Sequence, residues 1–515
     1  MDYETRVWNH VELEFSCSDF AGNPYGIRFW AMFSKKGSET VKIPGFYDGS
    51  GHWMIRFMPS EIGLFEYVTE SDIPELDKKS GCIAVLEPEA NAVGRMMVDP
   101  QNPRHVRWES GKSYFMVGFE ADWLGLMDFD DPSVPKARSL IDAISENGFN
   151  HVFMNVYAHD APWPGYLGRD SRYDFTAPDL WPFGGTNDAP DYEKLNPAFF
   201  ASLDRVIEYL RSKDIVCHLM IYVWNKKVNW PKQDSEADRR YFDYIVARYQ
   251  GYSNIVWDIS KEALTYGYCG PDYIKGKCSR LREIDGIGHL LTVHDKEFCE
   301  KYPDLLDLIS VQDWRTDLFG LMETMYARFE GKPVFNIEHG GYEESPFIMA
   351  PGDYQDAAVC LERNYLCLFA GVYSSYYWQG CSWNIVCYEP LSLPSEKKPR
   401  FDYFKSMKKF FEKYPFARMK PQASAEVVSS GHVLANDDDM IFILKPRESY
   451  CTHLRKMDGV ESISVSWFDP LSGEFSKLED LSVENFLALR SPWTGNFSIA
   501  CIKLHKNSPA IADKV

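Results

Sequence analysis

Apolar and polar residues alternate with a period of two along the first part of the chain. Residues 11–15, 53–57 and 64–68 show this alternation, which is typical of strands with one buried face. Turn-forming glycine, proline and asparagine residues separate these segments. Short alternating strands with such punctuation predict an N-terminal β-sandwich, which we place at residues 1–93.

From about residue 113 the pattern changes to short apolar runs separated by longer amphipathic stretches. Eight apolar runs are predicted as strands, at residues 114–118, 151–155, 216–223, 254–257, 290–293, 308–311, 333–337 and 372–377. The stretches with the clearest helical period are residues 138–147, 199–213, 237–249 and 354–370. Alternating strands and helices predict an α/β fold, and eight such units predict a (β/α)8 TIM barrel, which we place at residues 94–415. An open doubly wound sheet fits less well, because no glycine-rich phosphate-binding turn follows any strand.

The helical period ends near residue 416. Short apolar runs follow and are predicted as strands, at residues 426–428, 432–434, 440–444, 462–467 and 497–502. These runs predict a small C-terminal β-domain, a second sandwich, at residues 416–515. The expected architecture is therefore a TIM barrel flanked by a β-domain on each side.

The net charge argues against two classes of binding partner. The formal net charge is −20, which disfavours binding to nucleic acid and to anionic membrane surfaces. Aromatic residues make up 15% of the chain, and their rings suit the C–H faces of sugars as well as the cores of β-sandwiches. We therefore expect an oligosaccharide partner, no nucleic acid and no membrane.

Cysteine usage and the start of the chain bear on the compartment. The 12 cysteines include no C-x-x-C pair, and several lie inside apolar runs, where a reduced cysteine acts as a small hydrophobic residue. The first residues show no apolar segment of a signal peptide, and no apolar run approaches the length of a membrane span. These features predict a reducing, cytoplasmic setting.

Two glutamates follow strands that lie on opposite sides of the predicted barrel. Glu262 follows the fourth strand and Glu338 follows the seventh. The carboxyl ends of barrel strands meet at one edge, so two carboxylates there can face each other across a ligand. Glycoside hydrolysis needs such a pair, one acid to protonate the leaving oxygen and one carboxylate to attack the anomeric carbon. A lone glutamate at a strand end is more often part of a helix cap or a salt bridge, but two at these positions indicate a catalytic pair.

Polar and aromatic residues at the other strand ends are predicted to form a sugar subsite. The predicted substrate-binding residues are Asp122, Trp123, Asn155, Tyr157, His159, Tyr222, Trp224, Lys261, His294, Gln312, Trp314, Trp378 and Gln379. Asn225, Asp295 and Asp313 lie at the same strand ends. Taken singly, each of these residues could equally pack a loop.

The motifs around the two glutamates resemble those of glycoside hydrolase clan A. The resemblance is carried by Ala247-Arg-Tyr, Asn254-Ile-Val-Trp257 and Glu262, and by Lys332-Pro-Val and Glu338-His-Gly. Within the clan, nearly the whole chain is similar to bacterial glycosidases with an apiosidase-like barrel, an uncharacterised N-terminal sandwich and a small C-terminal β-domain. The N-terminal part of this similarity is carried by Val11-Glu-Leu-Glu-Phe, Asn23-Pro-Tyr25, Gly45-Phe-Tyr-Asp-Gly49, Trp53-Met-Ile-Arg-Phe57 and Gly63-Leu-Phe-Glu-Tyr67. The resemblance implies a retaining glycosidase with Glu262 as acid/base and Glu338 as nucleophile, acting on plant-type oligosaccharides.

Lys261 departs from the clan pattern. The clan usually has asparagine immediately before the acid/base, and that asparagine is implied to bind the 2-hydroxyl of the sugar. Lys261 could donate a hydrogen bond to the same hydroxyl, but its charge would also lower the pKa of a nearby carboxylic acid. Either Lys261 points away from Glu262 or the burial of Glu262 outweighs the charge.

Two other functions remain open at this stage. One is a non-catalytic carbohydrate-binding protein that keeps the barrel as a scaffold, and the other is a transglycosylase that uses the same covalent intermediate. No metal is expected, because H-x-H and H-E-x-x-H motifs are missing from the sequence, and a serine nucleophile is poorly supported, because G-x-S-x-G is missing as well. No cofactor is expected. The flanking β-domains are expected to brace the barrel or to mediate self-association into a homo-oligomer, rather than to bind glycan.

Overall fold

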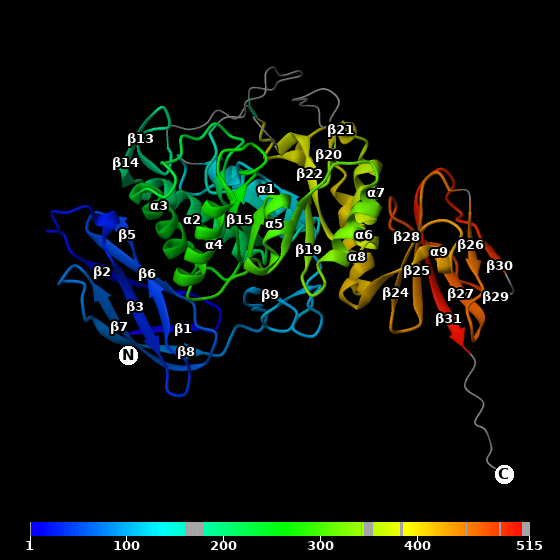
Figure 1. Cartoon of the computed structure of the whole chain (residues 1–515), viewed down its shortest axis with the longest axis horizontal. Helices are drawn as coiled ribbons and strands as arrows, with labels where there is room; N and C mark the ends of the chain where they lie inside the picture. Colours follow the sequence, from blue (N-terminus) through cyan, green and yellow to red (C-terminus); the bar gives the residue numbers. More distant parts are fainter. Residues whose placement is uncertain are drawn as a thin grey trace, which may run out of the picture.

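The computed structural model of the 515-residue chain describes residues 2–128, 130–159, 172–173, 180–340, 342–343, 354–381, 385–449, 451–483 and 486–506. At its centre, eight parallel strands form a nearly closed barrel (Figure 1). In chain order they are β11(Gly118–Glu120), β12(His151–Asn155), β15(Val216–Val223), β16(Ile255–Lys261), β17(Leu291–His294), β18(Ile309–Gln312), β19(Val334–Glu338) and β22(Tyr373–Trp378). Around the barrel they follow the order β17-β16-β15-β12-β11-β22-β19-β18. The Thr292 and Ser310 hydroxyls, 2.9 Å apart, link β17 to β18. The predicted α/β barrel is confirmed.

Helices follow most of these strands and surround the barrel (Figure 1). They are α1(Pro135–Glu146), α2(Pro197–Ser212), α3(Glu236–Tyr249), α4(Pro271–Ile284), α5(Lys296–Lys301), α6(Leu318–Arg328), α7(Ala357–Phe369) and α8(Phe401–Lys413). Local sequence explains several starts: proline occupies the first turn of α1, α2 and α4, and the side chains of Asn196, Ser235 and Asp356 cap α2, α3 and α7. The apolar face of each helix then packs on the strands.

The first strand and the last predicted helix begin later than the sequence pattern indicates. The apolar run at residues 114–118 is not a strand as a whole, because Tyr114 and Phe115 pack against Trp108 and Phe411 below the barrel. Regular pairing starts only at Gly118. The helix predicted from residue 354 starts at Ala357, after the short strand β21(Tyr354–Gln355).

A chain of polar side chains crosses the buried interior of the barrel. Tyr114 lies 3.0 Å from His151, His151 lies 3.1 Å from His218, and His218 lies 3.1 Å from Asp258. Asp258 in turn accepts the backbone N–H of His294 at 2.8 Å. Burial lowers the pKa of His151 well below its usual value, which keeps this imidazole neutral. Each group in the chain has a hydrogen-bond partner, so the network fixes the relative heights of the strands.

The N-terminal region contains two antiparallel-rich sheets. One has the order β1(Tyr3–Arg6), β8(Ser80–Leu86), β7(Gly63–Ser71), β3(Phe29–Ser34) and β4(Val41–Pro44). The other has the order β2(Val11–Ser16), β6(His52–Phe57) and β5(Phe46–Gly49). Apolar residues from both sheets form one buried cluster, and the region lies against α3 and α4 (Figure 1). The predicted β-rich N-terminal region is confirmed.

Buried ion pairs join this region to the barrel helices. The Arg56 guanidinium of β6 lies 2.7 Å from the Asp204 carboxylate of α2, and Arg248 of α3 lies 2.6 Å from the same carboxylate. Arg248 also reaches Asp48 of the sandwich, at 2.6 Å. Because one carboxylate neutralises two buried arginines, this contact fixes the orientation of the two parts.

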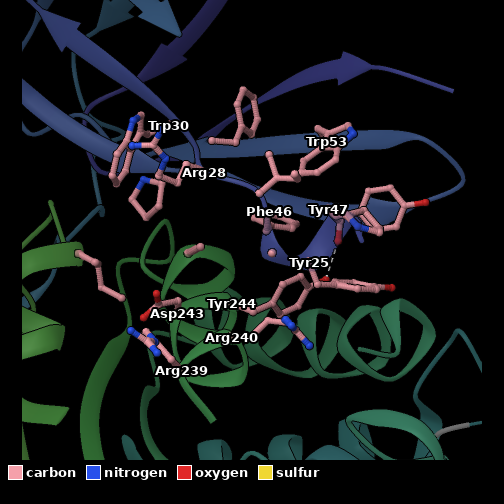
Figure 2. Close-up of a pocket in the computed structure, with 18 of the residues that line it drawn as sticks. Tyr25, Arg28, Trp30, Phe46, Tyr47, Trp53, Arg239, Arg240, Asp243 and Tyr244 are labelled. Carbon is pink, nitrogen blue, oxygen red and sulfur yellow. Dashed lines mark hydrogen bonds between the residues drawn. The ribbon is translucent and has the colours of Figure 1, made fainter. Parts of the chain in front are cut away.

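A cavity of about 390 Å³ lies beside this contact, between the sandwich and the outer side of the barrel. Figure 2 shows Trp30 and Tyr47 of the sandwich on one side and Arg239, Asp243 and Tyr244 of α3 on the other. The Tyr244 hydroxyl donates to the backbone carbonyl of Tyr47 at 2.8 Å. Glu262 and Glu338 do not line this cavity.

The C-terminal region is built on a sheet with the order β23(Met419–Gln422), β24(His432–Asn436), β25(Met440–Lys445), β31(Ser498–Lys506), β27(Val460–Asp469) and β28(Glu474–Phe475). Strand β29(Glu479–Ser482) also pairs with β27, and β26(Thr452–Arg455) pairs with β30(Phe486–Leu489). The strand predicted at residues 426–428 is wrong, because Ser424–Val427 forms the helical turn α9, closed by a bond from the Val428 N–H to the Ser424 carbonyl. Phe442 of β25 packs against Phe410 of α8, which joins the sheet to the barrel.

Candidate active site

The two predicted catalytic glutamates lie at the same edge of the barrel. Glu338 is the last residue of β19, and Glu262 comes directly after β16. Both side chains are buried, with 5% and 7% of their surface exposed. Glu262 has a φ of 58°, a left-handed conformation that is costly for a residue with a side chain, and its N–H donates to the His294 carbonyl at 3.0 Å. The tertiary structure thus holds Glu262 in a specific, strained orientation.

Gln312, the last residue of β18, connects the two carboxylates. Its Nε2 donates to Oε1 of Glu262 at 3.0 Å and to Oε2 of Glu338 at 2.9 Å. These two oxygens can therefore be no further apart than the two contacts laid end to end, about 6 Å. Glu262 also accepts a hydrogen bond from the side-chain amide of Asn225, which follows β15. The carboxylates face each other with one amide group between them.

Lys261 does not reach Glu262 and lies instead in a pocket of acidic side chains. Its Nζ is 2.8 Å from Oε1 of Glu338, 2.5 Å from Oε1 of Glu120 and 3.4 Å from Oδ1 of Asp122. Glu120 is the last residue of β11 and is fully buried, as is Lys261 itself. One buried ammonium group thus contacts three carboxyl groups at the ends of the barrel strands.

The surroundings shift the pKa values of the two glutamates in opposite directions. Burial raises the pKa of Glu262 to about 7, and the negative charge of Glu338 adds to this rise. Burial alone would also raise the pKa of Glu338, but the Lys261 ammonium and His294 outweigh it and lower this pKa below its usual value. Near neutral pH, Glu338 is therefore ionised while Glu262 still holds a proton in a large fraction of molecules.

Burial and neighbouring charges also shift the pKa values of the other titratable groups of the site. Burial and the nearby Glu338 raise the pKa of Glu120 well above its usual value, so this group favours its neutral form. Burial alone would raise the pKa of Asp122, but Lys226 and Lys261 lower it, and Asp122 is ionised. Burial lowers the pKa of His294 to about 4, so His294 is neutral at pH 7.

Several predicted substrate-binding residues are gathered around the two glutamates. His294, at the end of β17, places Nε2 3.5 Å from Oε1 of Glu338. Asp122 lies 3.1 Å from Nζ of Lys226 and accepts a hydrogen bond from the Asn155 amide at 3.1 Å. Trp123 is buried, and the Lys226 ammonium lies 5.6 Å from its ring centre. Together with Lys261 and Gln312, these residues form one connected polar cluster.

Other predicted residues make contacts elsewhere. The Tyr222 hydroxyl donates to Asp238 of α3 at 2.6 Å, and the ring of Tyr157 is packed among Trp181, Phe199 and Trp230.

Residues at the ends of β22, β18, β12 and β15 differ in exposure. Trp378 and Gln379 are buried after β22, whereas 44% of the Trp314 surface is exposed after β18. The His159 N–H donates to the Lys226 carbonyl at 3.1 Å, and Trp224 is half-buried beside Tyr222. Their roles in substrate binding stay predictions.

Glu120 and Lys226 were missing from the sequence-based site. Glu120 is the last residue of the first strand, which continues two residues beyond the predicted run at 114–118, whereas the sequence-based site included only Asp122 and Trp123 after this strand. The pattern of polar residues two positions apart, Glu120 and Asp122, was the available signal. Lys226 directly follows Asn225 and lies 3.1 Å from Asp122.

Across the residues that the structure describes, no group of three or more histidine, cysteine, aspartate or glutamate side chains is arranged to hold a metal ion. In that same part of the chain, the helices are too short or too polar for any of them to cross a membrane.

Comparisons with known proteins identify the family of the barrel and a similar fold. A family model described as "Apiosidase-like, catalytic domain" matches residues 100–389, and a domain of unknown function, DUF5060, matches residues 4–72. A crystal structure described as "a putative glycoside hydrolase", from Bacteroides vulgatus ATCC 8482, superposes with a TM-score of 0.77 over 98% of this chain and 100% of that chain, at 19% identity. A glycoside hydrolase family 5 mannosidase from Rhizomucor miehei matches 56% of this chain and 86% of its own, at 12% identity and a TM-score of 0.41. A search of curated proteins found no match.

The barrel and the family match define a glycoside hydrolase that acts on a carbohydrate substrate. The family model covers more than half of the chain, and the chain belongs to the apiosidase-like family.

Proposed function

We propose that this protein is a retaining glycosidase in which Glu338 is the nucleophile and Glu262 is the acid/base. The observation that carries the proposal is the Gln312 amide, whose nitrogen donates to both carboxylates at 3.0 and 2.9 Å. The two contacts laid end to end keep the accepting oxygens within about 6 Å of each other. Retaining enzymes hold their carboxyl groups about 5–5.5 Å apart, and inverting enzymes about 6.5–9.5 Å.

The charges around each glutamate support this division of roles. Lys261 contacts Glu338 at 2.8 Å and favours its ionised form, which a nucleophile requires. The pKa of Glu262, raised to about 7 by burial and by Glu338, keeps a proton available at neutral pH, which a general acid requires. The pair titrates as a unit, so ionising Glu338 helps to hold the proton on Glu262.

The proposed reaction has two steps. In the first, a Glu338 oxygen forms a bond to the anomeric carbon while the bond to the leaving oxygen breaks, and Glu262 transfers its proton to that oxygen. In the second, Glu262, now a carboxylate, takes a proton from water, and the resulting hydroxide oxygen displaces Glu338 from the anomeric carbon. Two inversions give net retention, and Glu262 ends protonated as it began.

The family match directs the choice of substrate. An apiosidase-like catalytic domain supports plant-type oligosaccharides that carry apiose or related furanosides as the sugar that is released. The twelve cysteine thiols are free, which is in keeping with a reducing, cytoplasmic setting as part of the proposal.

The test is to identify the first anomer that is released. The protein would be incubated with apiosyl, arabinofuranosyl and xylosyl 4-nitrophenyl glycosides and with pectin-derived oligosaccharides, and the product followed by proton NMR before mutarotation. Retention of configuration is expected, and Glu338→Gln should abolish the signal while Glu474→Gln, an exposed glutamate in the C-terminal sheet, should not. Inverted product would contradict the proposal, and glycan binding without turnover would favour a carbohydrate-binding scaffold.

A further inference from the structure

Aromatic rings gather beside Glu262, on the part of the barrel edge formed by the ends of β15 and β16. Tyr266 and Tyr268 are 45% and 55% exposed, and Trp224 is half-buried next to them. The ring centres of Trp224 and Tyr268 are 5.9 Å apart with planes inclined by 20°, and those of Tyr268 and Tyr266 are 6.1 Å apart with planes inclined by 25°. A contiguous group of exposed, nearly parallel rings on a protein surface indicates a binding surface.

Backbone hydrogen bonds connect the two ends of this group to Lys261 and to Glu262. The Trp224 N–H donates to the carbonyl of Lys261 at 3.3 Å, and the Tyr266 N–H donates to the carbonyl of Glu262 at 3.2 Å. Asn225, the neighbour of Trp224, donates from its side chain to the Glu262 carboxylate. The rings therefore keep a fixed position relative to the carboxyl group that donates the proton.

The segment that carries the two tyrosines is a well-connected turn. The Tyr268 N–H donates to the Ala263 carbonyl at 3.1 Å, and the Tyr268 carbonyl accepts from the Gln233 amide at 2.7 Å. The Leu264 N–H donates to the Asp295 carboxylate at 2.7 Å. Because these bonds already order the turn, a ligand that stacks on the rings loses little conformational entropy on binding.

We propose that Trp224, Tyr266 and Tyr268 form the subsite for the sugar on the leaving-group side of the cleaved bond. This proposal rests on the proposed role of Glu262 as acid/base. The general acid protonates the oxygen that departs with the leaving group, so the leaving group lies on the side of Glu262. Aromatic faces bind the apolar C–H faces of pyranose rings, and their polar edges bind hydroxyls.

The subsite implies a class of substrate. A small leaving group would gain nothing from rings on this side, whereas a sugar or a short oligosaccharide would cover them. Burial and the charges of Glu262 and Glu338 raise the pKa of Tyr266, so its hydroxyl stays protonated and can donate a hydrogen bond to a sugar oxygen. The natural substrate is therefore an oligosaccharide in which the released sugar is linked to another sugar residue.

The first measurement compares leaving groups. Wild type, Tyr266→Ala, Tyr268→Ala and Tyr268→Phe would be assayed on a pectin-derived oligosaccharide and on the fluoride of the released sugar, which carries no leaving-group sugar. The ratio of kcat/KM for the oligosaccharide to that for the fluoride should fall about tenfold in each alanine variant and stay within about twofold in Tyr268→Phe. Phe486→Ala, which removes a 61% exposed ring of the C-terminal sheet, is the matched control. An unchanged ratio in both alanine variants would overturn the proposal.

A binding measurement separates this subsite from the proposed hydrolase. Pectin- and hemicellulose-derived oligosaccharides would be titrated by calorimetry into Glu338→Gln and into Glu338→Gln combined with both tyrosine-to-alanine changes. About tenfold or greater weakening in the combined variant shows that the rings bind sugar; if the wild-type protein cleaves none of these glycans, the hydrolase proposal falls and the rings are a sugar-binding site without a leaving group. Equal affinity in the two proteins, or no binding of any of these oligosaccharides, overturns the subsite.

Discussion

The ends of β16 and β19 carry the same functional side chain in opposite surroundings. Glu262, after β16, is held by the neutral amides of Asn225 and Gln312. Glu338, at the end of β19, lies against the charged Lys261 and shares the Gln312 amide. Burial acts on both carboxyl groups, but the pKa of Glu262 rises to about 7 and that of Glu338 falls below its usual value.

The difference shows how one barrel edge prepares an acid and a nucleophile from two glutamates. Consecutive residues, Lys261 and Glu262, separate because Glu262 adopts a left-handed φ of 58° after the strand ends. The Lys261 side chain, at the end of the strand, contacts Glu338, whereas the left-handed turn directs the Glu262 side chain to Gln312. The contact of Lys261 with Glu338 and the turn at Glu262 together give the two carboxylates unequal charge environments.

Removal of the nucleophile is expected to have the largest effect. Glu338→Ala should lower kcat by about 10⁴-fold or more, because no other group can form the bond to the anomeric carbon. Added azide should restore turnover and give a glycosyl azide of inverted configuration. If azide instead gives a glycosyl azide of retained configuration, Glu338 is the acid/base and Glu262 the nucleophile, which contradicts the assignment.

Removal of the acid/base should have a smaller effect that depends on the leaving group. Glu262→Gln should lower kcat/KM by about 10²- to 10⁴-fold on oligosaccharides and much less on glycosyl fluorides, which need no proton. Wild-type activity should fall as the pH rises through about 7, where Glu262 loses its proton, and this alkaline limb should be missing from the variant. An alkaline limb that persists unchanged in Glu262→Gln would assign the titrating group elsewhere.

Removal of the lysine charge should reduce the difference between the pKa values of the two glutamates. Lys261→Met leaves Glu120, Asp122 and Glu338 without their shared ammonium, so the pKa of Glu338 should rise and the acidic limb of the pH–kcat/KM profile should move to higher pH. We expect a loss of about 10²-fold at pH 5 and less at pH 7. Lys261→Arg keeps the charge and should keep the limb within a few tenths of a pH unit; thermal unfolding would verify that both variants are folded. A profile that Lys261→Met leaves in place would show that the lysine is only structural.

Removal of the bridging amide should have the smallest effect. Gln312→Leu deletes one hydrogen bond to each glutamate but leaves Lys261 and Asn225 in place. We expect kcat to fall about tenfold, which corresponds to a hydrogen bond of ordinary strength in the transition state. Gln312→Glu is the complementary variant, and its added negative charge should raise the pKa of both glutamates and shift both limbs of the profile upward.

Much of the barrel could be predicted from the sequence because buried parallel strands are continuous apolar runs. Residues 151–155 and 216–223 were predicted as strands with the bounds that the structure has. The first strand was misplaced because Tyr114 and Phe115 are as apolar as a strand but pack below the barrel. Hydrophobicity alone does not distinguish a residue buried in a barrel strand from one buried in a neighbouring loop.

The site was predictable where chemistry follows directly from position, and not where it depends on side-chain direction. Glu262 and Glu338 could be identified because both follow strands of the barrel. The partners of Lys261 could not be predicted, because Glu120 and Glu338 come from β11 and β19, which are distant from Lys261 in the sequence. The contact of Tyr222 with Asp238 of α3 could not be predicted either, because a position at a strand end does not determine which face of the strand a residue occupies.

The most direct test of the account is to trap the covalent intermediate. The wild-type protein would be incubated with 2-deoxy-2-fluoro glycosides that carry a 2,4-dinitrophenyl leaving group, and the labelled peptide would be located by mass spectrometry. The account predicts one glycosyl group on the peptide that contains Glu338, attached to that carboxylate, with no label in Glu338→Gln. A label on Glu262, or turnover of the parent sugar with inverted configuration, would contradict it.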